Sequence, residues 1–352
     1  MIRKKLFLAF PMLTFLMIIG LLSCNSIEKE DFSFEVQSTS MTGSMRGLDV
    51  LNESCVWISG SGGEYCFTTD AGASWTKSVV PGAELLDFRD LHVFSEKSAL
   101  LMSAGPGEAS RVYRTDDAGQ SWVLCYQNTD SLAFFDGMDF LNDNEGVIFS
   151  DPVDSKLNLM VTKDGGRNWV RQNPESLPEL KTGEYAFAAS GTSIMYDLDG
   201  GLWIATGGSE ARIWHANSID GLWKIFTPPV IQGDPAAGLF SVSLQSDSKR
   251  IAVGGHYQKM DIMGSNVVLW DEKSQDWFVP EGGKSLPFME CVRWVSDDAV
   301  VAAGPPGVFF SPDSGESWTR IYDDGFHTFD VSQKGRVGWL ALNKGIVKRM
   351  SW

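Results

Sequence analysis

The sequence predicts an all-β fold, a seven-bladed β-propeller built from four-stranded antiparallel blades. Two observations predict this architecture: a turn motif of eight residues recurs along the chain, and its copies lie 41 to 54 residues apart. That distance is typical of repeated four-stranded units. A third observation concerns the chain ends, because each end carries strand patterns that lack a partner of their own. Together they predict one large domain over residues 32–352.

The turn motif consists of a hydroxyl residue, then Asp, then Gly, then Trp. Asp and Ser or Thr side chains bind backbone groups inside a tight turn, and Gly takes a positive φ. The Trp then begins the next strand and buries a large ring. Four clean copies occupy 68–75 (TTDAGASW), 115–122 (TDDAGQSW), 162–169 (TKDGGRNW) and 311–318 (SPDSGESW). The predicted structural residues are Asp70, Trp75, Asp117, Trp122, Asp164, Trp169, Asp313 and Trp318.

The spacing of the motif counts the blades. Two degraded copies end at Trp223 and Trp277, and the six tryptophans are then 47, 47, 54, 54 and 41 residues apart. A seventh unit follows Trp318, where 326–331, 337–342 and 345–350 read as three short strands. The alternating segment 32–37 (FSFEVQ) supplies the fourth. Joining the two ends in one blade closes the ring and removes unpaired strand edges.

The motif and its spacing resemble the Asp-box, or BNR, repeats of sialidase-like β-propellers. Several stretches also resemble bacterial secreted propellers related to the photosystem II stability and assembly factor family, some of which carry the label oxidoreductase. These stretches are 140–152 (FLNDNEGVIFSDP), 183–193 (GEYAFAASGTS), 207–213 (GGSEARI), 238–242 (GLFSV) and 253–257 (VGGHY). An Asp is more usual in that family where His256 stands. The resemblance implies a propeller, but propellers of this type serve sialidases, sorting receptors and assembly factors alike.

The first residues are predicted to be an export signal. Three basic residues at 3–5 precede an apolar run at 6–22, and Leu21-Leu22-Ser23-Cys24 resembles the lipobox of bacterial lipoproteins. Residues 1–24 are therefore expected to be a lipoprotein signal peptide with lipidated Cys24, and 25–31 a polar tether. The protein is then expected to sit in the cell envelope, at the outer membrane, on either face. The alternative is an uncleaved apolar anchor.

Charge and cysteines limit the function further. The net charge of -16, from 29 Lys and Arg against 45 Asp and Glu, argues against a nucleic-acid partner, which would need basic patches. Cys55 and Cys66 flank the turn 60–63, and either a disulfide between them or two buried thiols is consistent with the sequence.

A candidate site follows from aligning the inner strands. The apolar pairs expected to line the channel are 48/50, 91/93, 138/140, 186/188, 242/244, 292/294 and 329/331. The residues two positions earlier are Arg46, Arg89, Asp136, Glu184, Phe240, Glu290 and His327, and the turns between second and third strands add Asp151, Arg212, His256 and Tyr257. Polar groups from several blades that point at one axis build a pocket. Alternatively, they are merely solvated charges at strand ends.

The sequence gives little support for a cofactor or metal site. No Gly-x-Gly-x-x-Gly opens a helix after a strand, and the four His residues lack zinc spacing, so neither a cofactor nor a metal is expected. A sialidase would need an arginine triad and a Tyr nucleophile. Arg46, Arg89 and Arg212 could supply the triad, but Tyr is scarce in the sequence. A carboxylate-pair glycosidase stays open, since Asp136, Glu184 and Glu290 share the predicted rim.

The function expected from the sequence is a lipid-anchored binding or assembly scaffold without catalysis, with a glycoside hydrolase of the sialidase-like superfamily as the alternative. The expected partners are a membrane surface, through the lipid anchor, and a protein or glycan ligand at the propeller face. Arg46 and Arg89 occupy the same register in neighbouring blades, which predicts an anion site. Internal pairing of these arginines with Asp136 and Glu184 is the alternative.

Overall fold

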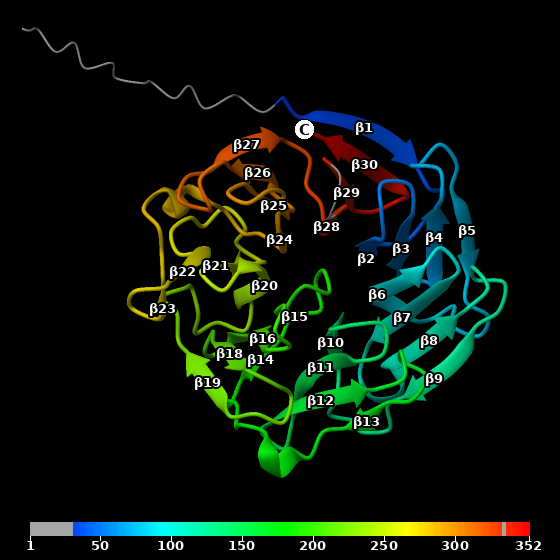
Figure 1. Ribbon diagram of the computed structural model, residues 1–352, viewed down its shortest axis with the longest axis horizontal. Coiled ribbons are helices and arrows are strands. Elements are labelled where there is room, and N and C mark those ends of the chain that lie inside the picture. The colour runs from blue at the N-terminus through cyan, green and yellow to red at the C-terminus, as the bar shows by residue number, and fades with distance from the viewer. Residues whose placement is uncertain (1–30, 333–335) are drawn as a thin grey trace, which may run out of the picture. The chain divides into compact units, whose positions relative to one another are not determined.

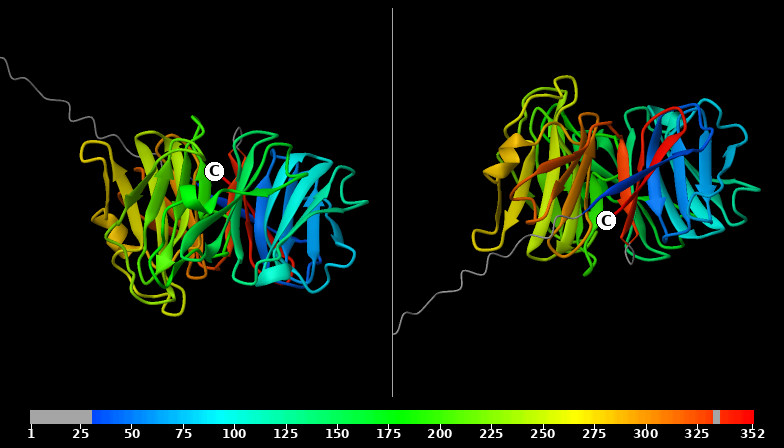
Figure 2. Two further views of the ribbon diagram at one scale, coloured as in Figure 1. Left: turned by 90° about the horizontal axis from the view of Figure 1, so that it is seen from below. Right: turned by 90° about the horizontal axis from the view of Figure 1, so that it is seen from above.

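A computed structural model describes residues 31–332 and 336–352. Residues 32–352 form one compact unit in which seven antiparallel sheets stand around a central axis (Figure 1). The strands run across the thickness of the ring in the side views (Figure 2). The predicted seven-bladed β-propeller is confirmed. Cys24, the signal peptide at 1–24 and most of the tether at 25–31 lie outside the described residues.

The first three blades follow one another along the chain, each with its strands in sequence order from the axis outward. Blade 1 contains β2 (Met45–Val50), β3 (Val56–Gly60), β4 (Glu64–Thr68) and β5 (Thr76–Val79). Blade 2 contains β6 (Asp87–Ser95), β7 (Ser98–Ala104), β8 (Arg111–Thr115) and β9 (Val123–Gln127). Blade 3 contains β10 (Phe135–Phe140), β11 (Gly146–Val153), β12 (Lys156–Thr162) and β13 (Val170–Arg171).

The remaining blades repeat this order. Blade 4 contains β15 (Ile194–Tyr196), β16 (Leu202–Ala205), β18 (Ile213–Ala216) and β19 (Trp223–Phe226). Blade 5 contains β20 (Ala237–Ser246), β21 (Lys249–His256), β22 (Val267–Asp271) and β23 (Asp276–Phe278). Blade 6 contains β24 (Cys291–Trp294), β25 (Val300–Gly304), β26 (Gly307–Ser311) and β27 (Thr319–Tyr322). Among the described residues, 3-10 turns lie at Gly107–Ala109, Pro174–Ser176 and Gly282–Ser285.

Blade 7 joins the two ends of the described chain. It contains β28 (Thr328–Val331), β29 (Val337–Ala341), β30 (Ile346–Ser351) and, outermost, β1 (Ser33–Ser38). The ladder between β1 and β30 runs from the Ser33 and Ser351 pair to the Ser38 and Ile346 pair, and the two strands lie side by side in Figure 1. The predicted closure by the N-terminal strand is confirmed.

Blade 4 departs from the predicted alignment. The inner strand expected around Ala186 and Ala188 is absent there, and Ile194–Tyr196 (β15) takes its place against β16. The preceding β14 (Glu184–Tyr185) instead pairs with β17 (Gly207–Gly208), which extends the sheet of blade 5 to six strands. Alanines bury little apolar surface, whereas Ile194 packs into the core with Trp214, so the larger side chain decides which segment becomes the strand.

The repeated turns have the hydrogen bonds that their residue types predict. In the first copy Thr68 Oγ1 donates to Asp70 Oδ1 at 2.7 Å, and Asp70 accepts from the Ser74 N–H at 2.9 Å. The Gly72 N–H donates to Thr68 Oγ1 at 2.9 Å, with Gly72 at φ 85°. The same bonds recur around Asp117, Asp164 and Asp313. Each turn joins the third strand of a blade to the fourth.

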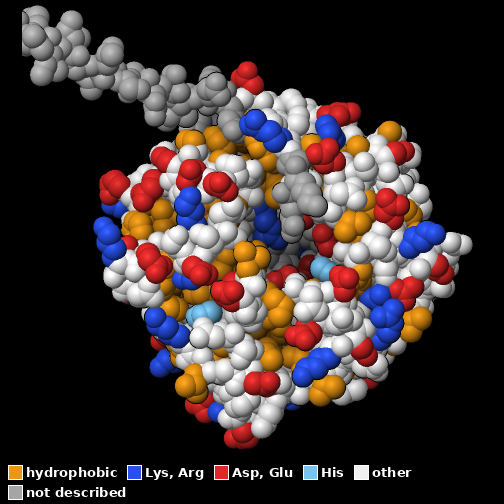
Figure 3. Space-filling model, viewed as in Figure 1, with side chains coloured by type: hydrophobic (Ala, Val, Ile, Leu, Met, Phe, Trp, Pro, Cys, Tyr) orange, Lys and Arg blue, Asp and Glu red, His pale blue; other side chains and the backbone are white. Residues whose placement is uncertain are grey.

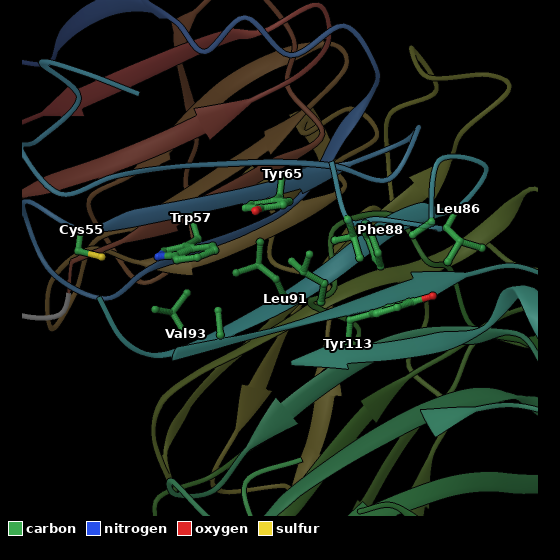
Figure 4. Packing of buried hydrophobic residues seen from close by; sticks show 12 residues of the cluster. Cys55, Trp57, Tyr65, Leu86, Phe88, Leu91, Val93 and Tyr113 are labelled. Atoms are coloured by element: carbon green, nitrogen blue, oxygen red, sulfur yellow. The ribbon is translucent and has the colours of Figure 1, made fainter. Parts of the chain in front are cut away.

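The core lies between neighbouring blades. Figure 4 shows the cluster between blades 1 and 2, where Trp57 and Tyr65 face Leu91 and Phe88. The motif Trp of each blade packs back onto the preceding blade, as Trp122 does edge-on to Tyr65 with ring centroids 5.0 Å apart. Trp169 is buried, whereas Trp75, Trp122 and Trp318 are half-buried.

The cysteines of the described chain are free thiols, so the alternative of a disulfide does not hold. Cys66 pairs with Ile58 across β3 and β4, and Cys55 lies beyond the end of that ladder. Cys55 packs toward blade 2 and Cys66 toward blade 7. Within residues 31–332 and 336–352, no helix has the length and apolar character needed to cross a membrane.

Candidate functional site

Two ends of the central channel carry distinct sets of polar residues. The first, here called the arginine face, is the end at which the inner strands begin, and it holds Arg46 on β2 and Arg89 on β6. The turns between second and third strands reach the same end, as the bridge between Ser61 and Asp87 shows. The second, here called the cavity face, is the end at which the inner strands finish and the repeated turns lie.

Arg46 sits at the start of the innermost strand of blade 1. One of its nitrogens, Nη1, donates to the carbonyl of Ala189 at 3.2 Å and lies 3.5 Å from Glu290 Oε2. The same Glu290 oxygen is 2.8 Å from His327 Nδ1. Burial lowers the pKa of Arg46, the Glu290 carboxylate opposes that shift, and the Arg89 charge adds to it. The structure therefore brings Arg46, Glu290 and His327 together, as the alignment predicts.

Arg89 is paired within its own blade. Its Nε donates to Asp87 Oδ2 at 2.8 Å, and its Nη1 donates to the carbonyl of Ala188 at 3.1 Å. The predicted alternative, pairing of the two arginines with Asp136 and Glu184, is therefore wrong in its partners: Arg46 takes Glu290 and Arg89 takes Asp87. Within the described chain the Nη2 of Arg46 and of Arg89 makes no hydrogen bond.

The side chains that carry these spare donors are partly exposed. The side chains of Arg46 and Arg89 are 21% and 31% exposed. Both arginines donate to consecutive carbonyls of one segment, Ala188 and Ala189, which fixes their heads beside each other. Two guanidinium groups that are fixed in place and have unused N–H donors are suited to bind a carboxylate.

Asp136 is buried and interacts electrostatically with Arg89 and with Asp151, which is half-buried. Asp136 Oδ2 and Asp151 Oδ1 are shielded from water and have no hydrogen-bond partner among the described residues. Burial and then the charge of Asp151 raise the pKa of Asp136 well above its usual range, and Arg89 opposes the shift. Burial raises the pKa of Asp151 to about 6. Burial and like-charge repulsion therefore favour the protonated form of Asp136.

Glu184 and Arg212 do not belong to this set. Arg212 Nε donates to both carboxylate oxygens of Glu184, at 3.0 and 2.9 Å, and its Nη2 also contacts the carboxylate. Thr206 and Trp214 donate to the same carboxylate, and both charged side chains are buried. The pair is a satisfied core salt bridge, so Asp136, Glu184 and Glu290 are not three free rim carboxylates.

An aromatic cluster adjoins the arginines. Phe187 and Phe240 stack with ring centroids 3.8 Å apart and 4° between their planes, and Phe288 meets Phe240 edge-on at 4.8 Å. Tyr257 reaches both stacked rings at 6.3 and 6.4 Å and is 39% exposed. His256 is buried, with Nε2 3.3 Å from Asp234 Oδ2.

The cavity face holds a feature that the alignment missed. A cavity of about 950 Å³ enters the channel from this end, and Figure 3 shows its hollow centre with acidic, basic and histidine side chains. Asp49, Asp90, Asp139 and Asp330 line it, each on an inner strand. The pattern apolar, Asp, apolar occurs in LDV, MDF and FDV of three inner strands and was the available signal.

These four aspartates tie neighbouring blades together. Each accepts a backbone N–H from the inner strand of the next blade. The bonds run from Val50 to Asp330 at 2.9 Å, Val93 to Asp49 at 2.7 Å, Met138 to Asp90 at 2.6 Å and Tyr196 to Asp139 at 2.6 Å. Burial and the Asp330 carboxylate raise the pKa of Asp49 to about 8, and burial raises that of Asp139 to about 6. The carboxylates are therefore structural ties.

In the part of the chain that the structure describes, no group of three or more His, Cys, Asp or Glu side chains is placed to hold a metal ion. His92 lies in the cavity, 3.6 Å from Asp49, and stacks on Phe140. Burial and the Arg114 charge lower its pKa to about 4, so it is neutral near pH 7.

Comparison with known proteins supports the fold. No protein-family profile and no curated protein sequence matches the chain. Similar solved structures include YCF48 bound to D1 peptide, with 15% identity and a TM-score of 0.66 over 91% of this chain and 97% of that one. YCF48 from Cyanidioschyzon merolae has 14% identity and a TM-score of 0.66 over 90% and 98% of the two chains.

A third neighbour is an enzyme. A catalytically inactive virginiamycin B lyase from Staphylococcus aureus, solved with quinupristin, has 12% identity and a TM-score of 0.62 over 92% of this chain and 100% of that one. At these identities the likeness shows a shared propeller fold and leaves the function to the residues of this chain.

Proposed function

We propose that this protein is a binding or assembly scaffold, anchored in the cell envelope by lipid on Cys24, that holds a peptide segment of a partner protein at the arginine face. The observation that carries the proposal is the pair Arg46 and Arg89, whose heads are fixed on adjacent carbonyls while their Nη2 groups stay unused. The two arginines would bind a carboxylate of the peptide through these unused donors. YCF48, which shares the fold, is seen with a bound D1 peptide, which supports a peptide as ligand.

The repeated turns support a place among Asp-box propellers. We propose that the four copies are Asp-box repeats and that the chain is a distant relative of the sialidase-like propellers. The shared hydrogen-bond pattern around Asp70, Asp117, Asp164 and Asp313 supports this relation. The turns lie at the cavity face and contribute no side chain to the arginine face, so they bear on ancestry and stability.

Glycoside hydrolysis is less well supported. A glycosidase needs two carboxyl groups about 5 to 10 Å apart, on either side of a sugar, one of them a proton donor. Glu184 is locked to Arg212, and Glu290 is held by Arg46 and His327. Asp136 is buried, and one carboxyl oxygen each of Asp136 and Asp151 is shielded from water. A glycan screen run beside the peptide screen tests this alternative directly.

The proposal is tested by selection and then by substitution. A phage-displayed library of random twelve-residue peptides is panned against the full chain, and the selected peptides are titrated against Arg89→Ala. Loss of a charge-assisted contact should weaken binding by about 2 kcal/mol. The melting temperature should change little, because the Arg89 and Asp87 pair is partly exposed.

Arg167→Ala is the matched control, because Arg167 also pairs with an aspartate but lies in a repeated turn at the opposite face. It should leave the affinity unchanged. Selected peptides that bind Arg89→Ala as tightly as the parent would exclude the arginines as the peptide site.

A further inference from the structure

We propose that the peptide held at the arginine face carries a large apolar side chain a few residues from its carboxylate, and that this side chain docks on the loop between β21 and β22. The inference rests on the proposed function and names the chemistry of its partner. The loop, residues 257–266, is the longest connection between a second and a third strand. It is called the apolar loop below.

The apolar loop exposes four large apolar side chains within seven residues. Tyr257, Met260, Ile262 and Met263 are 39%, 38%, 41% and 59% exposed. Side chains of this size rarely stand together in water unless they meet another molecule. Methionine adapts its shape to different apolar partners, and Tyr is a frequent anchor in interfaces.

The loop is held in place, so this exposure is not a consequence of a loose segment. The Tyr257 N–H donates to the Ala236 carbonyl at 3.0 Å, and the Phe288 N–H donates to the Met260 carbonyl at 3.0 Å. Asn266 Nδ2 donates to the Ile262 carbonyl at 2.6 Å. These bonds tie the loop to blades 5 and 6, and they leave its apolar side chains turned outward. A preformed surface lowers the cost of ordering on binding.

Three consecutive residues connect the apolar loop to the arginines. Phe187 stacks on Phe240 and lies within 6.3 Å of Tyr257, and the next two residues, Ala188 and Ala189, accept from Arg89 and Arg46. Phe187, which is half-buried, therefore links the exposed side chains of the loop to the residues that hold the two guanidinium groups, while Phe240 and Phe288 are buried. This continuity is why one extended segment can reach both.

The spare N–H donors of Arg46 and Arg89 select the occupant. The apolar loop carries both Lys259 and Asp261, so its own formal charges cancel. The protein as a whole has a net charge of -16, so the attraction for a carboxylate comes from the unused donors of the two arginines and not from the overall charge. An extended polypeptide with a carboxylate and a neighbouring aromatic or long aliphatic side chain fits both halves.

The test uses the same phage-displayed library of random twelve-residue peptides and the full chain. The selected peptides should share an acidic group and a large apolar residue at a fixed spacing. The double variant Ile262→Ser with Met263→Ser should weaken their binding about tenfold and leave the melting temperature unchanged, because both side chains are exposed. Val123→Ser, on the outer strand β9 and 64% exposed, is the matched control and should have no effect.

The outcomes separate the inference from the proposal beneath it. Peptides that depend on Arg89 but bind the double variant as tightly as the parent would overturn the apolar anchor and leave the peptide scaffold standing. Peptides that depend on neither Arg89 nor the loop, or the absence of any selected peptide, would overturn both. Dependence on Arg89 and on the loop together, with replacement of the apolar peptide residue by Ser giving the same loss as the double variant, supports the inference.

Discussion

At the scale of single residues, the channel aspartates show how a side chain can be acidic by type and structural by position. Asp49, Asp90, Asp139 and Asp330 each take one backbone N–H of the next blade, so four of the seven blade contacts near the axis are tied in the same way. Their mutual proximity and burial favour the neutral form of Asp49 and Asp139. A neutral carboxyl group still accepts a hydrogen bond, so the tie survives protonation.

These ties make stability depend on pH. The pKa of Asp49 in the folded protein, about 8, lies above its unfolded value near 4, so its contribution to stability is lost as the pH rises from about 4 to about 8. Asp49→Asn keeps an acceptor for the Val93 N–H and cannot ionise. We expect the variant and the parent to melt alike near pH 4, and the variant to be more stable by at least about 1 kcal/mol at pH 8.

Thermal unfolding of both proteins across that pH range measures the difference. The groups that face Asp49 are His92, Asp90, Asp330, Arg293 and Asp139, and all are unchanged in the variant. Asp247→Asn, at a side chain 81% exposed, is the control and should follow the parent. A variant that is less stable than the parent at every pH would mean that the ionised carboxylate is required.

At the scale of elements, both the backbone conformation and the packing between blades constrain the Gly of the repeated turn. The motif Gly sits at positive φ, and the turn presses on the preceding blade: a Cβ on Gly166 would lie 2.4 Å from Leu100 Cδ1. Gly82 has the same φ of 79° as Gly166 but nothing within 4 Å of its Cβ position. Substituting each of these two glycines by Ala therefore separates the free-energy cost of a side chain at positive φ from the cost of crowding a neighbouring side chain.

We therefore expect Gly166→Ala to destabilise the protein more than Gly82→Ala does. The Gly82 variant carries the left-handed backbone cost alone, about 1 kcal/mol, and the Gly166 variant adds the displacement of Leu100, about 1 to 3 kcal/mol more. Chemical unfolding measures both free energies. Equal losses would show that the turn has room against blade 2 and that the Gly is required for its φ alone.

At the scale of the whole molecule, the repeat pattern was sufficient to predict the fold. Six motif tryptophans and two unpaired ends implied seven blades and their closure, because a turn recurring at blade spacing has few other solutions. The prediction was wrong where side chains were too small or too evenly spaced to indicate which segment forms the inner strand. Ala186 and Ala188 mimicked an inner strand, and β14 joined the sheet of blade 5 instead.

The candidate site was less predictable, for a physical reason. The register of six inner strands correctly grouped Arg46, Arg89, Glu290 and His327 at one end. Partners were not predictable, because the arginine that pairs with Glu290 is 244 residues away in sequence, and such pairing depends on the ring being closed. Asp49, Asp139 and Asp330 were hidden for the opposite reason, since an acidic residue between two apolar ones reads as a solvated position until the neighbouring blade is in place.

The proposed lipid anchor makes a prediction about location. Cys24→Ser removes the only sulfur in the lipobox-like segment, so the protein should move from the membrane fraction to the soluble fraction, with the fold unchanged because the propeller begins after the tether. Cell fractionation followed by immunoblotting measures this. Cys125→Ser, in a strand of blade 2, is the control and should stay with the membrane. Retention of the Cys24 variant after a high-salt wash would favour the apolar anchor at 6–22.

The last prediction concerns ring closure, to which one short strand contributes. β1 joins three blades: it pairs with β30 in blade 7, Phe32 and Phe34 pack on Phe310 and Tyr322 of blade 6, and Gln37 accepts from the Trp75 indole of blade 1 at 3.0 Å.

A chain beginning at residue 39 lacks these contacts and exposes the edge of β30, so it should melt at least roughly 10 °C below a chain beginning at residue 32 and aggregate through that edge. Adding a synthetic peptide of residues 32–38 should restore part of the loss, because the strand binds by the same ladder. A truncated chain that melts with the parent would mean that the remaining contacts between blades 7 and 1, such as the Val50 to Asp330 hydrogen bond, hold the ring closed, and that β1 only covers an edge.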